Sequence, residues 1–134
     1  MKAMIDTSVL IAGLPAEIIG EIENYCSSMI CRAELARGLY AYEADPAKRR
    51  QAATRRELLR LLDAIPGFWI DFDRSASDGY GRLTAVPSTA IRHKDALIAG
   101  HCVSRQLPLV TGDKGFTRFS DLEFTLVGEP EPRA

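Results

Sequence analysis

Short apolar runs alternate along the chain with segments in which apolar residues recur at helical spacing. A run of three to five mostly apolar residues, bounded by polar or turn-forming residues, is typical of a buried strand. Strands are predicted at residues 3–5, 29–31, 68–72, 108–111 and 124–127.

The segments between these runs have the period of an α-helix. Leu58, Leu61, Leu62 and Ile65 fall at i, i+3, i+4 and i+7, and Pro66 then ends the helix. Small residues recur in the same way between Ala96 and Val103 and permit close packing on a sheet. Helices are predicted over 18–24, 32–43, from about Pro46 to residue 65, from an Asp73 cap to about 85, and over 92–105.

Strands that alternate with helices predict an α/β fold with a mainly parallel sheet. The chain has 134 residues, 46% of them hydrophobic and 26% charged, which fits one globular domain and excludes a disordered or coiled-coil protein. We expect the domain to occupy residues 1–127. Residues 128–134 contain proline and glutamate and are expected to form a flexible C-terminal tail.

The compartment is predicted from three features of the sequence. No apolar run approaches the roughly 20 residues that span a bilayer, and the first residues carry Lys2 and Asp6 where a signal peptide would be apolar. Cys26, Cys31 and Cys102 have no metal-ligand spacing. We therefore expect a cytoplasmic protein with reduced thiols and no association with membranes.

Charge is balanced over the whole chain but not along it. Seventeen basic and eighteen acidic residues give a net charge of −1, so the total does not indicate a nucleic-acid-binding protein. Residues 47–60, however, contain six basic residues and one acidic residue. Three interpretations of this stretch remain open: contact with an RNA backbone, a solvated outer helix face, or a surface for an acidic segment of a partner.

Acidic residues follow several of the predicted elements. Asp6 comes directly after the first strand, and Asp113 lies two residues beyond Thr111 at the end of a later strand. Glu34 is expected in the first turn of the helix after the second strand. In parallel sheets ligands bind outside the carboxyl ends of the strands, which would bring these three together. Asp95 precedes a strand, so this rule does not place it.

Four segments around these acids resemble the sequence blocks of PIN-domain ribonucleases, and in detail those of VapC-type toxins from toxin–antitoxin pairs. They are MIDTSVL (4–10), CRAELARG (31–38), KDALIAG (94–100) and TGDKGF (111–116), in the family's order. The resemblance implies a PIN-like fold with a five-stranded parallel sheet between helices. It also implies that Asp6, Glu34, Asp95 and Asp113 form one acidic site.

The resemblance further implies a metal-dependent nuclease. Clustered carboxylates hold Mg²⁺ or Mn²⁺ in such enzymes, and oxygen ligands suit these hard cations. If the four carboxylates lay about 6 Å apart, their mutual repulsion would reach roughly 17 kcal/mol at an effective dielectric constant near 20. Such a cluster needs a cation or raised pKa values. One departure is Gly115, where many relatives carry a further acid, which puts a second metal position in question.

Neighbouring polar residues have predicted supporting roles. The hydroxyls of Thr7 and Thr111 flank the acids and are placed to orient a carboxylate or a bound water, although each also fits an ordinary turn or cap. Arg92, His93 and Lys94 stand directly before Asp95, and we expect them to meet phosphates of the substrate.

The sequence thus favours an endoribonuclease toxin that cleaves an essential structured RNA, such as tRNA or rRNA, with a metal-activated water. The family resemblance implies a cognate antitoxin and a homodimer. Two alternative functions are compatible with parts of the sequence. An Asp-based phosphatase usually carries a second Asp adjacent to the first or two residues on, where this chain has Ser8. A non-catalytic RNA-binding module would be expected to lack some of the acids, and all four are present.

Overall fold

The computed structural model describes residues 1–85, 93–119 and 121–127. Arg92 and the predicted tail at 128–134 therefore lie outside the described residues. The helices are α1 (Thr7–Ala12), α2 (Ala16–Ile19), η1 (Ile22–Asn24), α3 (Met29–Glu43), η2 (Pro46–Lys48), α4 (Arg49–Asp63), α5 (Arg74–Thr84), α6 (His93–Arg105) and η3 (Lys114–Arg118). The strands are β1 (Ala3–Ile5), β2 (Tyr25–Ser28), β3 (Trp69–Ile70), β4 (Leu109–Thr111) and β5 (Phe124–Leu126).

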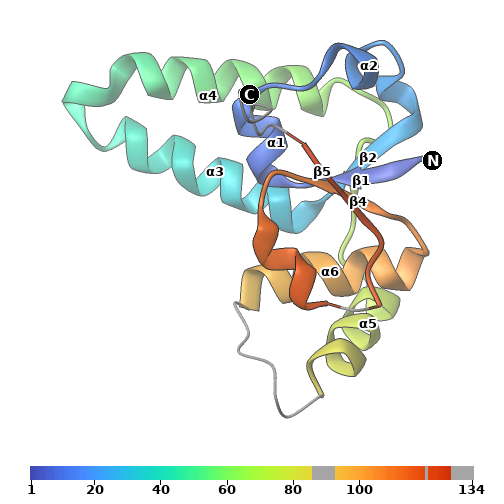
Figure 1. Cartoon of the computed structure of the whole chain (residues 1–134). Coiled ribbons are helices and arrows are strands. Elements are labelled where there is room, and N and C mark those ends of the chain that lie inside the picture. The colour runs from blue at the N-terminus through green and yellow to red at the C-terminus, as the bar shows by residue number, and fades with distance from the viewer. Residues whose placement is uncertain (86–92, 120, 128–134) are drawn as a thin grey trace, which may run out of the picture.

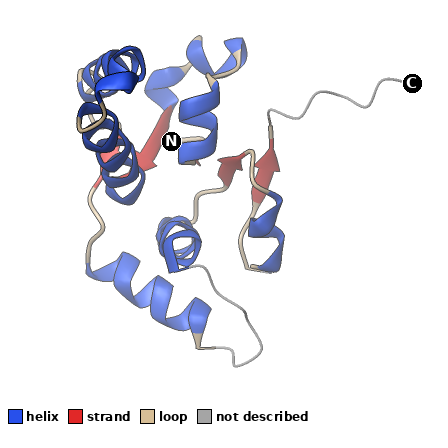
Figure 2. Cartoon of the chain, turned by 90° about the vertical axis from the view of Figure 1, so that its left-hand side faces the viewer, coloured by secondary structure: helices blue, strands red, loops and turns tan. Residues whose placement is uncertain are grey.

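The strands form one five-stranded sheet in the order β3-β2-β1-β4-β5. Every pair of neighbours is parallel, so all the carboxyl ends lie along one edge. Helices cover both faces: α1 to α4 lie on one side of the sheet, and α5 and α6 on the other (Figures 1 and 2). This single α/β domain confirms the predicted fold class.

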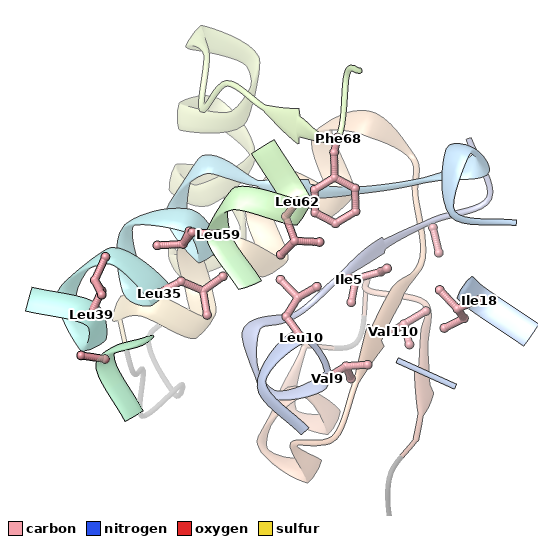
Figure 3. Packing of buried hydrophobic residues seen from close by; sticks show 12 residues of the cluster. Ile5, Val9, Leu10, Ile18, Leu35, Leu39, Leu59, Leu62, Phe68 and Val110 are labelled. Atoms are coloured by element: carbon pink, nitrogen blue, oxygen red, sulfur yellow. The ribbon is translucent and has the colours of Figure 1, made fainter. Parts of the chain in front are cut away.

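The central strand shows how the two helical layers are held. Along β1, Ala3 and Ile5 belong to one hydrophobic cluster, while Met4 between them belongs to the cluster on the opposite face. Successive side chains of a strand point to opposite faces, so an unbroken apolar run is what a strand covered on both sides requires. Figure 3 shows the first cluster, in which Leu35 of α3 and Leu62 of α4 lie among side chains of the sheet and α1.

The second cluster joins α6 to the other face of the sheet. Ala96 and Ala99 are fully buried in it, as their spacing predicted. Gly100 faces α5 instead of the sheet: a Cβ on Gly100 would lie 2.5 Å from the backbone nitrogen of Tyr80, and one on Gly79 would lie 2.3 Å from the carbonyl oxygen of Gly100. The two helices therefore cross in backbone contact.

The prediction of a strand at 29–31 was wrong. These residues form the first turn of α3, and the strand is Tyr25–Ser28 just before it. The error has a physical cause, because two serines in the strand are completely buried. Ser27 donates to the carbonyl oxygen of Ile5 at 2.6 Å, and the Ser28 hydroxyl accepts from the backbone N–H of Ile30 and so caps α3.

Other boundaries also differ from the sequence-based prediction. The single helix expected over 18–24 is divided into α2 and η1, and the strand expected over 68–72 has only two residues in the sheet. On α4 the buried leucines are Leu59 and Leu62, whereas Leu61 of the predicted stripe is half exposed. The helix after residue 73 does begin with the Asp73 cap, whose carboxylate accepts from the N–H of Ala76.

The basic stretch at 47–60 is largely engaged within the fold. Arg55 donates to the carbonyl oxygen of Leu35 and lies over the Tyr42 ring, which fastens α4 to α3. Arg56 pairs with Glu43, and Arg60 pairs with Glu57. These contacts favour the solvated helix face among the three interpretations of this stretch. No helix within the described residues is long and apolar enough to span a membrane.

Candidate active site

Asp6 lies at the carboxyl end of β1, in the middle of the sheet. It precedes α1, yet its carboxylate makes no capping hydrogen bond to that helix. Oδ2 instead accepts from the hydroxyl of Ser8 at 3.0 Å and from the hydroxyl of Thr111, at the end of β4, at 2.8 Å. The residue is only 5% exposed. A buried carboxylate held by hydroxyls from two elements is poorly explained as a helix cap.

Glu34 lies on α3 and faces the same edge of the sheet. Because α3 begins at Met29, Glu34 belongs to its second turn and not to the first turn as expected. Both carboxylate oxygens have partners: Thr7 Oγ1 donates to Oε1 at 3.1 Å, and Lys94 Nζ lies 2.9 Å from Oε2. Burial raises the pKa of Glu34, and the charge of Asp6 adds to this effect against the opposing influences of Lys94 and Thr7.

Asp95 and Lys94 are adjacent residues in the first turn of α6. Asp95 is 4% exposed, while more than half of the Lys94 side chain is accessible. The pKa of Lys94 is raised chiefly by its hydrogen bond to Glu34, with further contributions from the charges of Asp95 and Asp6. Three of the four predicted acids therefore lie within electrostatic reach of a single ammonium group.

Asp113 joins the site through the backbone after β4. Its N–H donates to Thr111 Oγ1 at 3.0 Å, and the same hydroxyl donates to Asp6. Its own Oδ1 accepts from the N–H of Gly115 at 2.8 Å and caps η3. A Cβ on Gly115 would lie 3.0 Å from this oxygen, so position 115 is directly beside the Asp113 carboxylate.

The structure thus assembles the predicted acids at one edge of the sheet from four different segments. The predicted hydroxyls also take part, because Thr7 holds Glu34 and Thr111 holds Asp6. Sequence reasoning overlooked Ser8 as a member of the site. Its hydroxyl contacts Asp6 and accepts from the N–H of Gly112 at 3.0 Å, which links α1 to the loop after β4. Its position two residues after the first acid was the available signal.

The three residues expected to meet phosphate are placed differently from one another. Lys94 faces the acids through Glu34. The ring nitrogen Nδ1 of His93 lies 3.1 Å from the hydroxyl of Tyr80 on α5. Arg92 lies outside the described residues.

The donor set suits a hard divalent cation by its chemistry, because Asp6 and Asp95 supply nearly buried carboxylates and the hydroxyls of Ser8 and Thr111 contact Asp6. The arrangement is not a closed metal cage. Within residues 1–85, 93–119 and 121–127, no three or more His, Cys, Asp or Glu side chains form a group that could hold a metal ion. In this state Glu34 is held by Lys94 and Asp113 by the η3 backbone.

Known structures of similar fold come from toxin–antitoxin complexes. VapBC-5 from Mycobacterium tuberculosis is 24% identical, with a TM-score of 0.75 over 94% of this chain and 98% of that chain. The DNA-bound VapBC of Salmonella typhimurium is 26% identical, with a TM-score of 0.68 over 93% and 97% of the two chains. VapBC2 from Rickettsia felis, bound to a promoter DNA fragment, is 22% identical, with a TM-score of 0.72 over 94% and 98%.

No curated protein matches the sequence significantly. The family model described as PIN domain matches residues 3–122, which include all four acids, both threonines and Lys94. The match also contains every strand of the sheet except β5. With the sheet order and the acidic edge described above, this match shows that the chain belongs to the PIN domain family.

Proposed function

We propose that the protein is the toxin of a VapBC-like toxin–antitoxin pair and acts as a metal-dependent endoribonuclease. The observation that carries the proposal is the environment of Asp6. Its carboxylate is buried, does not cap α1, and is held by Ser8 and Thr111 beside further acids at the carboxyl edge of the sheet. Active sites of open α/β folds lie at this edge.

Asp6, Asp95 and Asp113 would hold Mg²⁺ or Mn²⁺, and Glu34 would be a further ligand or would orient one. The bound cation would activate a water and neutralise charge on the phosphodiester. The chain's own residues supply the preorganisation. Thr111 and Ser8 fix Oδ2 of Asp6, so Oδ1 would be the oxygen that binds the cation. Thr7 of α1 fixes Glu34 of α3.

The substrate in this proposal is an essential structured RNA, such as tRNA or rRNA. Lys94, His93 and Arg92 would contact its phosphates at the mouth of the site. The exposed Lys94 side chain has the charge and the position for such a contact. The proposed partners are a cognate antitoxin, as in the VapBC complexes of similar fold, and a second copy of the chain. The proposed compartment is the cytoplasm, where the three buried thiols would stay reduced.

The two alternative functions have less support. In an Asp-based phosphatase the residue two positions after the nucleophile is usually a second acid, and here Ser8 donates a hydrogen bond to Asp6 instead. A non-catalytic RNA-binding module does not require two nearly buried carboxylates such as Asp6 and Asp95, and burying a charged carboxylate costs free energy of folding.

The proposal is tested with the purified chain and total bacterial RNA, incubated with Mg²⁺, with Mn²⁺ or with EDTA. We expect discrete fragments with either cation and none with EDTA. Asp6→Asn keeps the shape of the side chain and removes its charge, and should produce no fragments. Equal fragmentation by wild type and Asp6→Asn would overturn the proposal.

A further inference from the structure

Lys94 differs in its partner from three other cations, Lys2, Arg32 and Arg60. Each of these three binds one acid that lies outside the site. The partner of Lys94 is Glu34, one of the site acids, and the charges of Asp6 and Asp95 also act on its ammonium. This side chain therefore places a positive charge beside Glu34 and close to Asp6 and Asp95.

The geometry makes Lys94 an obstacle to a cation that uses Glu34. With Thr7 on Oε1 and Lys94 on Oε2, both oxygens of Glu34 are already engaged. A divalent cation can reach Oε2 only if the ammonium leaves. Even without that contact, a positive charge close to Asp6 and Asp95 lowers the affinity of the cluster for a second positive charge.

Lys94 can leave at little cost. Its side chain is 56% exposed, while that of Glu34 is 20% exposed, so the lysine is more accessible to solvent than the glutamate that it binds. The four-carbon stem has the rotatable bonds to swing the ammonium outward. There it would face the side from which the negatively charged substrate approaches.

We propose that Lys94 is a displaceable internal counter-ion: its ammonium neutralises Glu34 in the metal-free protein, competes with the divalent cation, and is released when the cation binds. This inference rests on the proposed function, because it assumes that the acids bind a cation. It makes Lys94 a positioning residue that holds Glu34 ready and weakens metal binding. When the cation binds, the released Lys94 ammonium would become available beside the site.

The test measures Mn²⁺ binding to the full purified chain without RNA, from the electron paramagnetic resonance signal of free Mn²⁺. Lys94→Met and Lys94→Gln both remove the charge, and each should bind Mn²⁺ about tenfold more tightly than wild type. Lys94→Arg keeps the charge and should stay within about twofold of wild type. Thermal unfolding of each variant checks that the fold is retained.

Lys2→Met is the matched control, because it also removes one positive charge from an exposed Lys–Glu pair. Lys2 precedes β1 and so lies at the opposite edge of the sheet from Asp6. Its Mn²⁺ affinity should equal that of wild type. If both neutral Lys94 variants bind Mn²⁺ no more tightly than Lys2→Met, the counter-ion role is wrong and the metal site stands. If neither wild type nor any variant binds Mn²⁺, the proposed metal site itself fails, and the inference fails with it.

Discussion

Thr111 Oγ1 donates a hydrogen bond to Asp6 Oδ2 at 2.8 Å and thereby joins the carboxyl ends of two adjacent parallel strands. The same oxygen accepts the N–H of Asp113. One fully buried hydroxyl thus fixes the side chain of one candidate ligand and the backbone of another.

Thr111→Val tests this relationship, since valine has nearly the same shape and lacks the hydroxyl. The substitution leaves the Asp113 N–H without this acceptor and leaves Asp6 Oδ2 with Ser8 as its remaining hydroxyl donor, so we expect a loss of about 1–3 kcal/mol in the free energy of unfolding. We also expect RNA cleavage to fall by about tenfold or more, because Asp6 loses one of the two hydrogen bonds that fix its Oδ2. Urea denaturation and initial rates give both quantities. Thr111→Ser restores the hydroxyl and should recover most of the rate; a rate equally low in both variants would contradict the role of the hydrogen bond.

The crossing of α5 and α6 offers a matched pair of glycine substitutions. Gly79→Ala places a methyl group 2.3 Å from the carbonyl oxygen of Gly100, so the helices must separate, at a cost of roughly 1–3 kcal/mol or more. Gly81→Ala lies on the same helix with no atom within 4 Å of its new methyl group. It should stabilise the protein by about 0.5–1 kcal/mol, the usual gain from alanine in a helix. The midpoints of urea denaturation measure both changes. Equal midpoints for the two variants would refute the backbone contact between α5 and α6.

His101 predicts how stability depends on pH. Its ring Nδ1 lies 2.8 Å from the Ser28 hydroxyl, and the ring packs edge-to-face on Phe72. Burial, aided by the charge of Arg105, lowers the pKa of this imidazole below the ordinary value near 6.5. The unfolded chain therefore binds a proton more readily than the folded chain. Stability is complete above about pH 6.5 and falls as the pH drops toward the lowered pKa, by at most about 1.4 kcal/mol per pH unit.

His101→Asn removes the titrating group and retains a polar side chain that can hydrogen-bond to Ser28. The variant should be less stable at pH 7.5, and the part of the acid-induced loss that His101 causes between pH 6.5 and 5.5 should disappear. Urea denaturation at the three pH values measures this slope. An unchanged slope in His101→Asn would show that the buried imidazole is not the responsible group.

Two neighbouring arginines on α4, Arg55 and Arg56, should differ in how much they contribute to stability. Arg55 donates to the Leu35 carbonyl oxygen and lies over Tyr42, so Arg55→Met should cost about 1–2 kcal/mol of stability. Arg56 forms an exposed pair with Glu43, and Arg56→Met should change stability by less than about 0.5 kcal/mol. Thermal denaturation compares them. If the basic stretch instead tracks RNA, both substitutions should weaken RNA binding equally while stability hardly changes.

The sequence predicted the elements whose apolar pattern is strong. The run at Ala3–Ile5, the buried Ala96 and Ala99 of α6 and the Asp73 cap lie where they were expected. The second strand was missed because Ser27 and Ser28 are polar, and only tertiary partners make their burial favourable. Misplacing that strand also misplaced Glu34 within α3. Local patterns do not report hydrogen bonds made to distant segments.

The sequence predicted which acids form the candidate site, but not the contacts that hold them. The strand-end rule brings Asp6 and Asp113 together. Asp95 was predicted only from the family resemblance, because it lies at the start of α6 and not after a strand. The pairing of Lys94 with Glu34 joins residues 60 positions apart, and nothing in the spacing indicates it. The dual role of Ser8 is likewise visible only in three dimensions.

The most direct measurement of the central claim is a map of new RNA 5′ ends after induced expression in a bacterial host, with Asp6→Asn expressed to the same level as the control. The account predicts growth arrest and a small set of discrete ends with wild type, and neither with Asp6→Asn. Growth arrest by wild type without new 5′ ends, or the same ends with both proteins, would contradict the assignment of Asp6 to a ribonuclease active site.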